Sequence, residues 1–155
     1  MPRQLRTIAL LVAAACVGLA VSCTGTDMRS VKEIEVPPSA HKSELEGAYE
    51  VKLRTVSSEV LRELKEKYGS ADVEIYTLAP DAEWSAVNAF YDGRLGPLNY
   101  SRDRSLAEER QGYRLGVWTR RGWFSQEAVA VAFINTGQTP EAAEQKFLAV
   151  FLAGK

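Results

Sequence analysis

The chain has 155 residues, 46% of them hydrophobic and 25% charged, which is typical of a globular protein rather than a disordered or fibrous one. Its formal net charge of −1 gives no global reason to expect a nucleic-acid partner. The sequence contains one histidine, His41, and two cysteines, Cys16 and Cys23. This inventory excludes a metal site built from several histidines, and we expect neither a metal nor another cofactor.

The first residues differ in kind from the rest of the chain. Arg3 and Arg6 precede an uninterrupted run of apolar and small residues from 8 to 22, and no acid comes before Asp27. As a helix, this run would span roughly 22 Å, which is short of the ~30 Å hydrocarbon core of a bilayer. These features predict a secretory signal peptide over residues 1–22, and the alternative is a membrane-anchoring helix that stays attached.

Residues 19–23 read Leu-Ala-Val-Ser-Cys and resemble the lipobox of bacterial lipoproteins. In that family the cysteine receives a diacylglyceryl thioether, the signal peptidase cuts before it, and the new amino group is acylated, with palmitate a typical fatty acid. The resemblance implies that Cys23 is the lipidated first residue of the mature chain. Ser22 suits the position before the cut, although Ala20 stands where leucine is commoner. Cleavage at the rival Cys16 would leave a very short apolar run.

Lipidation at Cys23 implies where the protein resides. The chain would be secreted across the inner membrane and anchored to the outer membrane on its periplasmic side, or to the outer face of the cell membrane in a one-membrane bacterium. Thr24 follows the cysteine where Asp would indicate inner-membrane retention. Because Cys16 leaves with the signal peptide, Cys23 has no disulfide partner within its own chain. Beyond the membrane, the expected partner is an envelope protein or lipid that the sequence does not identify.

Hydrophobic periodicity predicts two helices in the mature chain. The first runs from residue 57 or 58 to 68 and ends at Gly69, with apolar residues recurring along one face. The second has Asp81 as its N-cap and ends at Gly93 or shortly after it. Residues 44–56 fit either a strand or a helix, and periodicity leaves both interpretations open.

Alternating apolar residues predict several strands. These cover residues 72–78, 98–102, 113–119, 123–135 and 147–153. Residues 120–122 form the predicted hairpin turn, and 105–111 form a polar loop. Residues 147–153 lack a clear helical face, which favours a strand over a helix. Residues 128–134 are apolar on both faces, which indicates a central strand covered on both sides or a strand whose alanine face is lightly covered.

This order of elements predicts an α+β domain over residues 44–155, with a mostly antiparallel sheet and two helices packed on one face. Residues 23–43 form the expected lipidated N-terminus and flexible tether, because they include Pro37 and Pro38 and few large apolar residues. His41 would be solvated there. Four segments of the domain resemble small bacterial lipoproteins, a resemblance that implies no activity or site residues: Tyr76-Thr77, Ala89-Phe90-Tyr91, Trp118-Thr119-Arg120 and Phe147-Leu148-Ala149-Val150.

The domain shows no Gly-rich phosphate loop, no cluster of metal ligands and no nucleophile elbow. We therefore predict a protein that is not an enzyme. A hydrolase that uses paired carboxylates is a remote alternative. Its only candidates by proximity are Asp81, Glu83, Glu108 and Glu109.

Two further features suggest binding. Arginines are in excess between 94 and 123, and Arg114, Arg120 and Arg121 are candidates for binding anions such as lipid phosphates. Trp118 and Trp123 flank the predicted turn, where they would form a cross-strand pair or line a groove. The sequence thus predicts a lipid-anchored, non-catalytic envelope protein that acts as a binding or structural module. The alternative is a carrier or sensor of a small apolar or lipid ligand held between the sheet and the helices.

Overall fold

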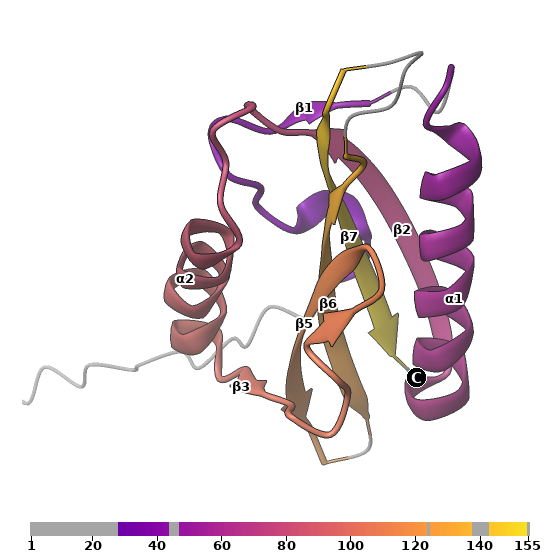
Figure 1. Cartoon of the computed structure of the whole chain (residues 1–155). Helices are drawn as coiled ribbons and strands as arrows, with labels where there is room; N and C mark the ends of the chain where they lie inside the picture. Colours follow the sequence, from indigo (N-terminus) through magenta and orange to yellow (C-terminus); the bar gives the residue numbers. More distant parts are fainter. Residues whose placement is uncertain (1–27, 44–46, 124, 138–142, 155) are drawn as a thin grey trace, which may run out of the picture.

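The computed structural model describes residues 28–43, 47–123, 125–137 and 143–154, so the predicted signal peptide and Cys23 lie outside the described residues. The described part contains one seven-stranded sheet in the order β1-β2-β7-β6-β5-β3, with β4 paired to β5 and all neighbours antiparallel (Figure 1). The strands are β1 (His41–Lys42), β2 (Ser70–Thr77), β3 (Ser101–Arg102), β4 (Glu109–Arg110), β5 (Tyr113–Arg121), β6 (Gln126–Asn135) and β7 (Lys146–Gly154). The helices are α1 (Glu50–Tyr68) and α2 (Trp84–Leu95), with short 3₁₀ turns η1 (Val31–Glu33) and η2 (Gly96–Leu98). The predicted α+β class is confirmed.

The two helices cover opposite faces of the sheet, so the expectation that they share one face is wrong (Figure 1). The cause lies in β6 at the centre of the sheet. Ala128, Ala130 and Ala132 face the α1 side, and Val129 and Val131 face the α2 side. Because each face is apolar, leaving either in water would forfeit about 1.5–3 kcal/mol for every large side chain exposed. Of the two interpretations left open for residues 128–134, the structure shows the central strand covered on both sides.

Helix α1 begins at Glu50, which makes 50–56 helical. Its buried apolar positions lie three and four residues apart on one face: Leu53, Val56, Val60, Leu64 and Tyr68. Helix α2 begins later than predicted, because Pro80 and its neighbours form a turn in which the Ala82 amide donates to the Ala79 carbonyl at 3.0 Å. Glu83, not Asp81, is therefore the N-cap residue of α2.

Two strand boundaries also differ from the prediction. Arg120 and Arg121 remain in β5 rather than forming the turn, because Arg120 lies opposite Glu127 and its guanidinium binds that carboxylate at 2.7 Å. The turn comes later, where the Gly122 amide donates to the Ser125 carbonyl at 2.8 Å. The segment predicted as a polar loop contains β4. The prediction of a last strand is confirmed by β7.

Residues 28–43 pack on the domain, so the structure corrects this part of the predicted tether. Val31 and Ile34 are buried in the core on the α2 side, and His41 and Lys42 pair with β2. The Ala40 amide donates to the Pro37 carbonyl at 2.9 Å, so the prolines form a turn here rather than an extended spacer. His41 is exposed, as expected.

Asp103 connects the C-terminal end of α1 to the segment between β3 and β4 through hydrogen bonds. Its carboxylate accepts hydrogen bonds from Lys67 Nζ at 2.7 Å, from the Tyr68 hydroxyl, and from the Ser105 amide at 2.9 Å. Burial alone would raise the pKa of Asp103. The hydrogen bonds from Lys67 and Tyr68 outweigh that effect and hold the pKa well below its usual value.

This low pKa predicts how stability depends on pH. A carboxyl whose pKa falls on folding stabilises the protein above its unfolded pKa of about 4, and this stabilisation disappears as pH falls toward the folded pKa. We expect Asp103→Asn to be less stable at pH 7 and to lose less stability than the wild type as pH falls below about 4. Urea unfolding at a series of pH values measures both effects. Asp72→Asn, at an exposed acid on β2, is the matched control, and pH profiles alike for both variants would contradict the prediction.

Candidate functional site

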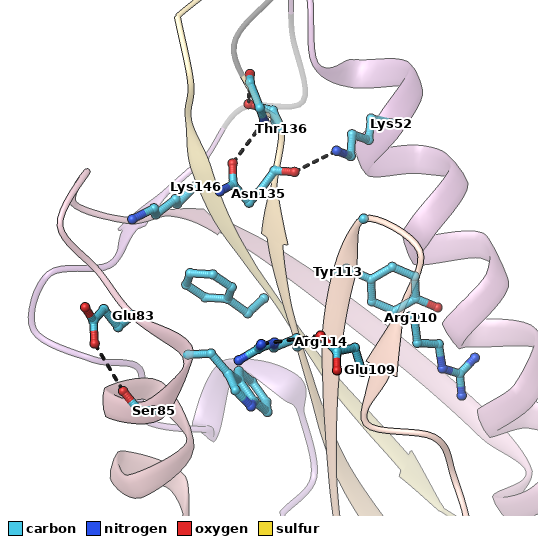
Figure 2. Close-up of a pocket in the computed structure, with 14 residues that line it drawn as sticks. Lys52, Glu83, Ser85, Glu109, Arg110, Tyr113, Arg114, Asn135, Thr136 and Lys146 are labelled. Carbon is cyan, nitrogen blue, oxygen red and sulfur yellow. Dashed lines mark hydrogen bonds and ion pairs between the residues drawn. The ribbon is translucent and has the colours of Figure 1, made fainter.

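A pocket of about 720 Å³ opens at the end of the sheet where β5 and β7 begin and β6 ends (Figure 2). Its walls come from the first turn of α1, the N-terminus of α2, β4 and the strand ends. The lining residues are Lys52, Glu83, Trp84, Ser85, Glu109, Arg110, Gly112, Tyr113, Arg114, Phe133, Asn135, Thr136, Gly137 and Lys146. The pocket volume lies within the range typical of small-molecule sites.

Two lysines place positive charge in the pocket wall. Lys52 Nζ donates to the backbone oxygen of Asn135 at 2.6 Å (Figure 2). Lys146 Nζ donates to the backbone oxygen of Ala82 at 2.9 Å. Neither ammonium group forms an ion pair with an acid in the described part of the chain. The neutral carbonyls hold both groups in place, and their charge remains available to a ligand.

Both arginines of the pocket form ion pairs with acidic side chains, and the two pairs differ in strength. Arg110 turns away from the pocket toward α1 (Figure 2). Its guanidinium binds Glu63 through two nitrogens, at 2.6 and 2.8 Å. Its hydrogen bonds with Glu63 raise the pKa of Arg110 and lower the pKa of Glu63, so this pair is structural. Arg114 reaches Glu109 at 3.4 Å on the exposed rim, where such a pair contributes only about 0–1 kcal/mol. Arg114 is therefore easily redirected to a ligand.

Aromatic side chains supply the apolar part of the pocket. The rings of Trp84 and Phe133 lie 6.3 Å apart between centroids, in a tilted arrangement. The indole nitrogen of Trp84 donates to Glu108 at 2.8 Å, which fixes the ring. Burial raises the pKa of the Tyr113 hydroxyl to about 12, so this group is neutral at pH 7.

The three candidate arginines do not form one site. Arg114 lies at the pocket, while Arg120 is on the same face of β5 but six residues away, paired to Glu127 and over the ring of Tyr100. Arg121 is exposed on the opposite face of the strand. Because successive strand residues point to opposite sides, arginines close in sequence are separated in space.

The two candidate groove tryptophans are also apart, which contradicts the cross-strand pair. Trp118 is 1% exposed and donates its indole N–H to Asp92 at 2.7 Å, so it is a core residue rather than a groove wall. In the sheet register it lies opposite Val129. Trp123 is 97% exposed, just beyond the end of β5.

Only two of the four candidate carboxylates line the pocket. Glu83 and Glu109 line the pocket. Glu108 and Asp81 do not line it, and the carboxylate of Glu108 accepts the hydrogen bond from the indole of Trp84. Sequence reasoning missed Lys52 and Lys146, which lie far apart in the chain. A lone lysine on a helix or strand carries no local signal that distinguishes it from ordinary surface charge.

In the part of the chain that the structure describes, no three His, Cys, Asp or Glu residues gather as metal ligands. No helix there is long and apolar enough to cross a bilayer. Comparisons with protein-family models, curated proteins and solved structures give no match to this chain.

Proposed function

We propose that the protein is a lipid-anchored, non-catalytic envelope protein whose domain binds a small organic anion in the pocket described above. One observation carries the choice of ligand: Lys52 and Lys146 present charge that no described acid neutralises. The anchor is supported by the lipobox-like sequence that ends at Cys23.

The pocket favours a ligand with two distinct parts. A carboxylate or phosphate would accept hydrogen bonds from the two lysines and from Arg114 on the rim. A flat apolar body would lie against Trp84 and Phe133. Aromatic acids combine both properties, so we assign them as the ligand class.

A carrier or sensor of an apolar ligand is the second candidate, and the aromatic floor of the pocket favours it. Buried side chains occupy the interfaces between the sheet and both helices, so we place an apolar ligand in the pocket as well. The two candidates differ in charge dependence. An apolar ligand would bind equally well after the lysines are neutralised.

Neutralising the two lysines tests the proposed ligand class. We expect the double variant Lys52→Gln with Lys146→Gln to bind benzoate and phenyl phosphate at least about tenfold more weakly than the wild type, since a charged hydrogen bond contributes about 1.5–3 kcal/mol. Ligand-induced thermal stabilisation and the emission of Trp84 measure binding. Lys65→Gln, near the end of α1, is the matched control and should bind as the wild type does. Benzamide, which lacks the charge, should bind weakly to all variants. Equal binding of benzoate by the double variant would favour the apolar-ligand candidate.

Mass spectrometry of the protein extracted from membranes tests the anchor. We expect a mature N-terminus at Cys23 that carries a diacylglyceryl group and an amide-linked fatty acid. Cys23→Ser should retain the uncleaved leader and lose both additions, because the lipid-dependent signal peptidase acts only on the modified cysteine. Cys16→Ser should be processed as the wild type. An unmodified N-terminus that begins before Cys23 would contradict the anchor.

A further inference from the structure

The first described residues, Met28 and Arg29, lie at the end of the sheet that carries the β5–β6 turn. Met28 and Arg29 share a groove with Ser125, which belongs to the turn between β5 and β6, and with Gly154 at the end of β7. Met28 also lines a second groove together with Leu98, which follows α2. The chain therefore enters the domain beside the β5–β6 turn, at the opposite end of the strands from the pocket.

Chain length limits how the domain can be oriented on an anchor at Cys23. Cys23 precedes Met28 by five residues, which span at most about 18 Å when fully extended. The row Ser70–Gly154 and the row Thr77–Phe147 are seven residues apart along β2, or about 23 Å. With the pocket end on the bilayer, Met28 would be held farther from the surface than this segment reaches. An anchor at Cys23 is therefore incompatible with the pocket end resting on the bilayer and favours the turn end.

The exposed apolar side chains are concentrated at this same end. Of the large hydrophobic residues in the described chain, three are exposed: Trp123 at 97%, Val51 at 77% and Leu98 at 40%. Trp123 lies within the β5–β6 turn closed by Gly122 and Ser125, and Ser125 shares a groove with Met28. Leu98 lines a second groove with Met28, whereas Val51 lies in the first turn of α1, at the pocket end. Tryptophan favours the boundary between lipid headgroups and acyl chains, where its ring and its N–H are both satisfied.

The charge beside Trp123 suits a headgroup layer. Arg121 is exposed, and neither Arg121 nor the side chain of Arg29 forms an ion pair with an acid among the described residues. The guanidinium group matches the oxygens of lipid phosphates, and anionic lipids attract such groups near the surface. Asp72 and Glu127 line the groove beside Met28 and are opposing charges, and Glu127 is paired with Arg120.

We propose that Trp123 and Arg121 contact the lipid headgroups of the membrane that holds Cys23, so that the pocket faces away from the bilayer. This inference rests on the proposed lipid anchor and adds an orientation to it. It commits the turn end to a lipid surface rather than to a protein partner.

The test uses the full lipidated protein, reconstituted in phosphatidylcholine vesicles. Trp84 and Trp118 are buried, so the fluorescence that aqueous iodide quenches reports Trp123. We expect this iodide quenching to be present in detergent and lost in vesicles, with a blue shift of the emission. Vesicles of brominated phosphatidylcholine should quench wild-type emission, and Trp123→Phe should lose that quenching.

The double variant Val51→Trp with Trp123→Phe is the matched control, because it places a tryptophan at the pocket end. Its iodide quenching should persist in vesicles, and brominated lipid should leave it unaffected. Vesicle flotation separates the two proposals. Protein that floats while Trp123 remains open to iodide overturns the orientation and leaves the anchor standing. Equal quenching of both tryptophans by brominated lipid also overturns the orientation, and failure to float overturns both.

Discussion

Replacing Trp118 by alanine is expected to lower the free energy of unfolding by about 3–5 kcal/mol. The side chain is 1% exposed and packs against the ring of Tyr91, with centroids 5.7 Å apart. The guanidinium carbon of Arg102 lies 4.3 Å from its centroid on top of the ring. The substitution would leave a cavity between β5 and α2 and remove the indole donor of Asp92.

Urea unfolding followed by circular dichroism measures this loss. Trp118→Phe separates the two contributions, because it keeps most of the ring and removes the hydrogen bond to Asp92. Trp123→Ala is the control for tryptophan loss as such. Trp123 is 97% exposed, and a change within about 0.5 kcal/mol is expected there. A Trp118→Ala effect as small as the Trp123→Ala effect would contradict the packing described above.

Gly116→Ala is expected to lower the free energy of unfolding by about 1–3 kcal/mol, because the site has no room for a methyl group. A Cβ at this position would lie 2.7 Å from a ring carbon of Trp118 and 2.9 Å from Arg102 Nη1. The ring cannot retreat, since Tyr91 packs against it. A glycine in the middle of β5 is thus required by the close approach of the tryptophan ring rather than by its own backbone angles.

Gly93→Ala is the matched control, and it is expected to raise the free energy of unfolding rather than lower it. Gly93 lies within α2, and a Cβ added there meets no atom within 4 Å. Alanine in a helix is favoured over glycine by roughly 0.5–1 kcal/mol, so this variant should be more stable than the wild type. Thermal unfolding of the two variants side by side measures both effects. Equal shifts in the two midpoints would show that Trp118 and Arg102 do not restrict Gly116.

The fold class could be predicted because the strongest signals are local. The alternation in β5 and β6 and the apolar residues 147–153 indicated adjacent strands before any contact was known. The two apolar faces of β6 also indicate that both sides of the sheet are covered. The expectation that sequential helices share a face led to the wrong layer arrangement. Val31 and Ile34 carried too little periodicity to reveal that their segment docks on the α2 side.

The candidate site was less predictable, because its residues meet only through long-range contacts. Lys52 comes from α1 and Lys146 from β7, and neither has a neighbour in sequence that marks it. Arg110 shows the opposite problem. It belongs to a stretch rich in arginine, yet Glu63 on α1 neutralises it. Excess charge counted along a sequence does not indicate which face carries it or which acid lies opposite.

The position of β7 determines when the sheet can be completed during folding. It follows every other strand in sequence, yet it lies between β2 and β6 and joins the two parts of the sheet. Until β7 is available, β2 has only the two-residue strand β1 as a neighbour, and α1 lacks much of the surface on which it packs. The sheet therefore cannot be completed from the N-terminal part of the chain alone, before β7 is available.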